Sequence, residues 1–169
     1  NSKGERDPEM HQTRKGNQWY FGMKAHIGSD LDSALVHSLS TTPANVGDIC
    51  ETHKLLHGDE EMAFADAGYT GVDKRAELKG CKATWYVAMK RGKRKRLRAR
   101  GGTLGQANEA VEQAKPGIRA LVEHPFRVIK QQFGHRKTRY RGLRKNSAQL
   151  HTLFALANLY MARKELMAS

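Results

Sequence analysis

An alternation of apolar and polar side chains over residues 19–27 does most to constrain the fold. Its apolar members fall on one side of an extended chain, a period of two that predicts a half-buried strand. They are Trp19, Phe21, Met23, Ala25 and Ile27. Turn formers at 28–33 and apolar residues at 34–40 predict that the chain returns as the second strand of a hairpin. The fold must therefore contain a sheet.

Strand-like and helix-like segments follow the hairpin. We expect a short helix over residues 48–56, ended by Gly58, and a buried strand over residues 62–66. A second short helix over residues 73–79 and a strand over residues 83–89 come next. This order predicts a mixed sheet with flanking helices, and therefore an α/β protein.

The remainder of the chain is predicted to be helical from about Gln106. Because proline removes a helical hydrogen bond, we expect the helix to be bent or broken at Pro116 and Pro125. Asn146 or Ser147 is expected to cap the last helix. An apolar stripe on that helix predicts core packing, and it consists of Leu150, Leu153, Phe154, Ala157, Leu159 and Met161.

Charge is distributed unevenly along the chain. The net charge is +13, yet residues 1–89 hold 10 Lys and Arg against 13 Asp and Glu, whereas residues 90–169 hold 20 against 4. A basic half of this density favours contact with nucleic acid over a role in solubility alone. In residues 90–100, 8 of 11 side chains are basic. Their mutual repulsion predicts a flexible loop over residues 90–105.

Length and composition narrow the remaining choices. A chain of 169 residues can bury one core, to which Trp19 and Trp85 are expected to contribute, and we expect one domain. No stretch approaches the ~20 apolar residues of a membrane helix, and no secretory signal is visible. Two cysteines are too few for a disulfide framework. We expect a cytoplasmic protein, and the polar start at Asn1 suggests a fragment of a longer one.

Two carboxylates are the strongest candidates for chemistry. Asp66 ends the apolar run of the predicted strand, at the sheet end where α/β folds bind ligands. Arg119, Glu123 and Lys130 recur at helical spacing and share a helix face. Because Mg²⁺ binds converging carboxylates, these residues suit a phosphate-handling metal site. The alternative makes Asp66 a turn residue and Glu123 a salt-bridge partner of Arg119 and Arg127.

Two weaker patterns have ordinary explanations as well. Tyr140 and Arg141 suit either a DNA contact or a tight turn before the last helix. A zinc site is conceivable, although solvated histidines on a helix are commoner. Its ligands would be Cys50, His53, His57 and Cys81.

Three tracts resemble a known family. They are residues 6–28 (RDPEMHQTRKGNQWYFGMKAHIG), 64–71 (FADAGYTG) and 123–146 (EHPFRVIKQQFGHRKTRYRGLRKN). Together they resemble the catalytic domain of bacterial insertion-sequence transposases, in the insertion-sequence-five group of DDE enzymes. The resemblance implies an RNase H-like fold of the retroviral-integrase-like superfamily. It also implies three acidic residues that bind two Mg²⁺ or Mn²⁺ ions.

The resemblance assigns roles to individual residues. Asp66 matches the family's second catalytic aspartate and Glu123 its catalytic glutamate, so both are implied to be catalytic and to bind metal. Arg119 and Lys130 match the signature's arginine and lysine, which contact DNA or support the glutamate. The tyrosine that sister families place three residues before the arginine is Pro116 here. Other DNA-binding or supporting residues expected on these tracts are Arg127, Arg139, Arg141 and Lys145.

The first aspartate of the family pattern has no match. In the family it lies on a strand that precedes the point where this chain starts, and Asp7, Asp30 and Asp32 match loop or turn positions. We therefore expect residues 1–169 to be one catalytic domain truncated at its N-terminus, and to be largely inactive alone.

The resemblance implies metal-dependent DNA cleavage and strand transfer. The expected partners are transposon ends and target DNA, on which the protein forms a homo-oligomer in the bacterial cytoplasm, near the nucleoid. Two other hypotheses remain open. The chain is alternatively a catalytically inactive nucleic-acid-binding remnant, or a basic structural or ribosome-associated protein.

Overall fold

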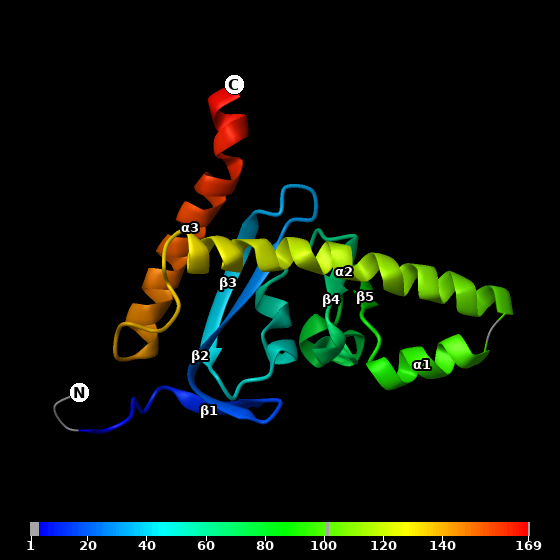
Figure 1. Ribbon diagram of the computed structural model, residues 1–169, viewed down its shortest axis with the longest axis horizontal. Helices are drawn as coiled ribbons and strands as arrows, with labels where there is room; N and C mark the ends of the chain where they lie inside the picture. The colour runs from blue at the N-terminus through cyan, green and yellow to red at the C-terminus, as the bar shows by residue number, and fades with distance from the viewer. Residues whose placement is uncertain (1–3, 101, 169) are drawn as a thin grey trace.

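Two small sheets and three long helices organise the computed structural model, which describes residues 4–100 and 102–168 (Figure 1). The first sheet is antiparallel and has the order β1-β2-β3. Its strands are β1 (His11–Lys15), β2 (Gln18–Ser29) and β3 (Val36–Pro43). The second sheet pairs β4 (Met62–Ala65) with β5 (Thr84–Val87) in parallel. The predicted α/β class is confirmed, but the strands form two sheets rather than one mixed sheet.

The predicted hairpin is present as β2 and β3. Their antiparallel register runs from Met23 opposite Pro43 to Ser29 opposite Val36. Asp30 shapes the turn, because its Oδ1 accepts hydrogen bonds from the Ser33 amide at 2.7 Å and the Ser33 hydroxyl at 2.8 Å. These bonds lower the pKa of the Asp30 carboxyl. Strand β1, which was not anticipated, pairs with the first part of β2.

The β2 strand bends at Gly22, where its pairing changes from β1 to β3. Gly22 is buried and has a φ of 153°, which glycine adopts readily and other residues rarely do. Met23 packs against the core, whereas Trp19 and Phe21 are exposed. The prediction that Trp19 fills the interior is therefore wrong, because the bend carries the first part of β2 away from the helices.

The short helices predicted after the hairpin form as single 3-10 turns. They are η1 (Asp48–Cys50), η2 (Thr52–Lys54), η3 (Ala67–Tyr69), η4 (Val72–Lys74) and η5 (Ala76–Leu78). The predicted helix over residues 73–79 is interrupted at Arg75, whose extended backbone (ψ 139°) separates η4 from η5. These turns connect β3, β4 and β5.

The predicted loop over residues 90–105 is wrong, because the basic segment is helical. Helix α1 spans Arg91–Arg100 and helix α2 begins at Gly102, with residue 101 outside the described residues. Arginine and lysine are good helix formers. An ion pair between Arg94 and Glu109, 2.7 Å apart, also offsets repulsion within α1 by joining it to α2.

Helix α2 spans Gly102–Gln131 and continues through both of its prolines. The predicted break is therefore wrong. The ring of Pro125 is almost fully buried, so the apolar surface it buries offsets the hydrogen bond that proline removes. The continuous helix keeps Arg119, Glu123 and Lys130 on one rigid element.

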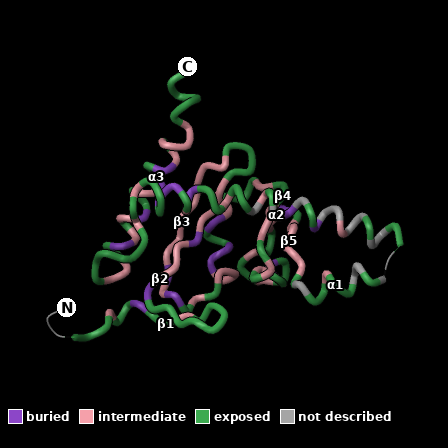
Figure 2. The backbone as a smooth tube through the Cα atoms, viewed as in Figure 1, coloured by how far each residue is buried: buried purple, intermediate pink, exposed green. Residues whose placement is uncertain are grey.

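The core lies where α2 and α3 (Leu143–Ala168) cover β2 and β3 (Figure 2). Phe126 of α2 meets Phe154 of α3 edge to face, with ring centroids 5.2 Å apart. The predicted stripe on α3 is confirmed except at Leu159, which is exposed. The buried core residues are Val128, Ile129, Leu150, Phe154 and Ala157. None of the helices in the described residues combines the length and apolarity needed to span a bilayer.

Helix α3 is capped differently from the prediction, because it begins at Leu143, before Asn146. The buried amide of Asn146 donates to the carbonyl oxygens of Tyr140 and Gly142, each at 2.7 Å. The side chains that cap α3 come from residues near the N-terminus of the chain. Asp7 accepts a hydrogen bond from the Gly142 amide and Glu9 accepts one from the Leu143 amide, both at 2.6 Å.

Candidate active site

Asp66 lies where β4 ends and η3 begins, as the sequence predicted. Its Oδ1 accepts a hydrogen bond from the Gly68 amide at 2.7 Å, so the carboxylate caps the turn that follows the strand. A Cβ at position 68 would lie 2.9 Å from the same oxygen, so a larger residue there would displace the carboxylate. The turn thus fixes the orientation of a carboxylate that remains exposed to solvent.

Tyr69 links this turn to a second carboxylate. Burial, followed by the negative charges of Asp48 and Asp66, raises the pKa of Tyr69 to about 12. The phenol is therefore neutral at physiological pH and lies within electrostatic range of both carboxylates. The turns η1 and η3, which carry Asp48 and Tyr69, also pack against each other. Asp48 consequently belongs to the surroundings of Asp66, which the sequence did not reveal.

Two side chains of β2, Lys24 and His26, contact the Asp48 carboxylate. The Lys24 ammonium lies 3.2 Å from Asp48 Oδ1 and also donates to the Val46 carbonyl at 2.8 Å. His26 Nδ1 lies 3.3 Å from the same carboxylate oxygen. The hydrogen bond from His26, assisted by Lys24, lowers the pKa of Asp48 to about 2. Asp48 is therefore ionised throughout the physiological range.

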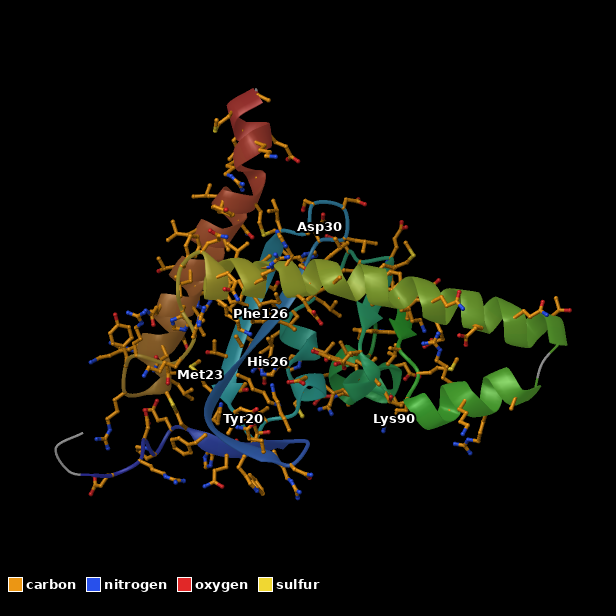
Figure 3. The ribbon with its side chains drawn as sticks, in the orientation of Figure 1. Tyr20, Met23, His26, Asp30, Lys90 and Phe126 are labelled. Carbon is orange, nitrogen blue, oxygen red and sulfur yellow. The ribbon has the colours of Figure 1, made fainter. Side chains whose placement is uncertain are left out.

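The His26 ring is buried between β2 and the short turns (Figure 3). Its Nε2 lies 2.8 Å from the Thr42 hydroxyl on β3. With a proton on Nδ1, the ring donates to Asp48 and accepts from Thr42, so both ring nitrogens have a partner. His26 thus connects β2 to both β3 and η1.

Glu123 lies on helix α2. The helix packs against β2 and β4, and Figure 1 shows it crossing both sheets. Glu123 and Lys130 are exposed on α2, and the Lys130 ammonium lies 5.8 Å from the Phe126 ring centroid. Arg119 lies on α2, but its side chain is outside the described part of the structure.

A buried ion pair fixes α2 against the end of β5. Lys115 pairs with Glu112 and donates to the Val87 carbonyl at 2.9 Å. Glu112 also accepts from the Met89 amide at 2.9 Å. Burial raises the pKa of Glu112, but the bonds from Lys115 and Met89 outweigh it and lower the pKa. Glu123 follows Glu112 by 11 residues, about three helical turns, so both lie on nearly the same side of α2.

Of the other predicted DNA contacts, Arg127 lies on α2, whereas Arg139, Arg141 and Lys145 lie close to the start of α3. Arg127, Arg139, Arg141 and Lys145 are all exposed. Arg139 and Arg141 lie in the basic loop, which we define as residues 132–142. Arg141 approaches Glu5 at 3.9 Å, and Asn146 fixes the end of the loop. Tyr140 is exposed in the same loop.

The zinc hypothesis is wrong for the part of the chain that the structure describes. There, no three His, Cys, Asp or Glu side chains form a group able to hold a metal ion. His57 instead pairs with Glu60 at 2.9 Å, and its ring lies 4.1 Å from that of His37. Asp66 and Glu123 are accordingly two carboxylates on separate elements.

Comparison with known protein families places most of the chain in one of them. Residues 2–159 match the protein family described as "Transposase DDE domain". No solved structure matches the chain significantly. The family match covers both β4 with Asp66 and the part of α2 that carries Glu123.

Proposed function

Because the chain belongs to the DDE transposase family, we propose that it cleaves DNA and transfers strands at a metal-dependent site that includes Asp66 and Glu123. The observation that supports the proposal is that Asp66 ends β4, a strand against which α2, the helix carrying Glu123, packs. The RNase H-like fold expected of such enzymes is part of the proposal. Bacterial insertion-sequence-five transposases remain the subgroup that the sequence resembles.

The donor chemistry fits the metal ions that the family implies. Asp66 and Glu123 offer carboxylate oxygens on exposed side chains, and hard divalent cations prefer such ligands. These two residues would hold Mg²⁺ or Mn²⁺, with two ions expected in the complete site. When bound, the ions supply an activated water and stabilise the oxygen that leaves the scissile phosphate.

Neighbouring residues of the chain position the carboxylates. The Gly68 amide orients Asp66 Oδ1, and the neutral Tyr69 lies beside it without adding negative charge. The contacts between Glu112, Lys115 and β5 set the position of α2, and with it that of Glu123. Exposed arginines and lysines then neutralise DNA phosphates without reading bases.

A third carboxylate is expected from another part of the full-length protein. Asp7 caps α3, and Asp30 and Asp32 lie at the hairpin turn. Both sheets have an edge open to a further strand, because among the described residues β4 pairs with β5 alone and Met23–Ser29 pairs with β3 alone. Open edges are templates for strand pairing. They support a proposal in which an added strand carries the first aspartate.

The test replaces each carboxylate in the full-length transposase. We expect Asp66→Asn and Glu123→Gln each to reduce Mg²⁺-dependent nicking of transposon-end DNA by about a thousandfold, since each would remove a metal ligand. Gel-shift affinity for the same DNA should change less than about threefold, because phosphate contacts dominate binding.

Asp73→Asn is the matched control, because Asp73 is an exposed carboxylate on the neighbouring turn η4. It should nick DNA at the wild-type rate. Undiminished nicking by both site variants would overturn the assignment. Wild-type protein that binds DNA but nicks with neither Mg²⁺ nor Mn²⁺ would instead favour the inactive remnant.

A further inference from the structure

Three consecutive aromatic side chains lie exposed on one hairpin. We define the aromatic hairpin as residues 11–22, which comprise β1 and the part of β2 paired with it. Trp19, Tyr20 and Phe21 are 62%, 46% and 42% exposed. Large apolar rings gathered on a surface commonly mark an interaction site, because leaving them in water is unfavourable.

Guanidinium groups accompany two of the three rings. Arg14 lies opposite Trp19 in the ladder, with its Cζ 6.0 Å from the ring centroid. The same guanidinium donates to the Gly16 carbonyl at 3.0 Å and to Asn17 Oδ1 at 3.2 Å, which holds it in place. Arg6 Cζ lies 5.3 Å over the Phe21 ring. The surface therefore presents ring faces and fixed positive charges together.

The aromatic hairpin is locally basic within an otherwise acidic half of the chain. Residues 10–29 contain no Asp or Glu. Three carboxylates precede this stretch: Asp7 and Glu9 are engaged with the start of α3, and Glu5 lies 3.9 Å from Arg141. The same bonds bring the base of the hairpin beside the basic loop, as Figure 1 shows at the lower left. Asp7 and Glu9 thus link the base of the hairpin to the end of the basic loop.

We propose that the aromatic hairpin binds unpaired nucleotides of DNA, with bases stacked on Trp19 and Phe21. These two rings lie on one face of β2, two residues apart. Aromatic rings beside arginines suit single strands, because every base has a π-face and every nucleotide a phosphate. Paired bases in duplex DNA do not offer that face. The proposal rests on the proposed function for its choice of DNA as the partner.

The test compares single-stranded and duplex DNA on the full-length protein. We expect Trp19→Ala/Phe21→Ala to weaken binding of a fluorescein-labelled oligothymidine about tenfold or more, whereas affinity for a duplex of equal length changes less than about threefold. For this double variant, the slope of log K against log salt for single-stranded DNA should equal that of the wild type, because every cation that neutralises a phosphate remains. Arg14→Gln should lower that slope by about 0.7.

Two matched variants accompany the aromatic pair. Leu156→Ala/Leu159→Ala removes exposed apolar side chains from α3 and should leave both affinities unchanged. Trp19→Phe/Phe21→Tyr keeps a ring at each position and should retain single-strand affinity within about threefold. Circular dichroism of each variant should match that of the wild type.

The outcomes separate this inference from the proposed function. Wild-type protein that binds neither form of DNA would overturn both. Duplex binding with single-strand affinity unaffected by Trp19→Ala/Phe21→Ala would overturn the hairpin inference alone. The hairpin inference would also fail if that variant changed the oligomeric state in sedimentation experiments but not single-strand affinity, since the rings would then cover another protein surface.

Discussion

At the scale of single residues, Asp48 is the most firmly held carboxylate near the candidate site. Its Oδ1 receives both Lys24 and His26, and Lys24 is further anchored by the Val46 carbonyl. The side chain is nevertheless 45% exposed, so solvent screens part of this stabilisation. Asp48 thus contributes to stability through its charge and joins β2 to η1.

This arrangement predicts a pH-dependent effect of Asp48→Asn. The pKa of Asp48 is lowered to about 2 by folding, so its contribution is complete above the unfolded-state pKa and is lost as the pH falls toward 2. We expect Asp48→Asn to cost about 1 kcal/mol of unfolding free energy at pH 7, after a discount for solvent screening. The difference should shrink steadily between about pH 4 and pH 2.

Urea unfolding of both proteins at several pH values measures this difference. Asp59→Asn is the control, because Asp59 is exposed in the loop before β4 and should show little difference at any pH. A cost for Asp48→Asn that stays constant down to pH 2 would mean that charge is not the cause.

The sequence reveals where some residues of the candidate site lie in the fold and conceals the positions of others. Asp66 could be predicted because an apolar run followed by glycines marks the end of a strand. The pairing of His26 with Asp48 spans 22 positions and depends on how η1 folds back over β2. A histidine in a strand and an aspartate at the start of a short helix are both common, so neither residue stands out in the sequence. Only the folded chain brings them together.

At the scale of elements, the start of α3 depends on the start of the chain. Asp7 and Glu9 accept hydrogen bonds from the first amides of the helix, which have no partner within it. Their negative charges also interact favourably with the helix dipole. The segment that precedes β1 is thereby fastened to the end of the basic loop.

We therefore expect Asp7→Ala and Glu9→Ala each to lower the free energy of unfolding by about 1 kcal/mol. Asp7→Asn should cost less than Asp7→Ala, since its amide oxygen still accepts the hydrogen bond. Thermal and urea unfolding check these values, with Asp59→Ala as an exposed carboxylate whose loss should cost less than about 0.5 kcal/mol. Equal stability of Asp7→Ala and wild type would show that the cap contributes nothing.

Elements with strong local patterns were predicted well. The β2–β3 hairpin, β4 and β5 follow from alternation, apolar runs and turn residues. Helix α1 cannot be predicted from charge repulsion alone, because the ion pair between Arg94 and Glu109 that offsets the repulsion is a tertiary contact. The continuity of α2 was missed for a similar reason, since burial of Pro125 is invisible in the sequence.

At the scale of the whole molecule, positive charge gathers on the helical half. Residues 90–169 carry 20 Lys and Arg against 4 Asp and Glu, and they form α1, α2, the basic loop and α3. Several of these side chains are exposed around the start of α3. A phosphate backbone that meets this surface releases counterions, which makes binding sensitive to salt.

This distribution predicts which cations set the salt dependence of DNA binding. Replacing Arg139, Arg141 and Lys145 together by glutamine should reduce the slope of log K against log salt by about 0.9 for each phosphate that is no longer neutralised. Replacing Lys74, Lys79 and Lys82, three exposed lysines of the acidic half, changes net charge equally and should leave the slope nearly unaltered. Identical slopes for the two triple variants would mean that net charge, rather than this surface, governs binding.

Helix α2 is 30 residues long, about 45 Å, and it touches β2, β4, α1 and α3. A rigid rod of that length transmits rotation along its axis. Any repacking around Val128 or Ile129 that turns the rod will also swing Glu123, which protrudes one to two turns away. Evolution can thus tune the geometry of the glutamate through interior methyl groups that never meet the nucleic acid.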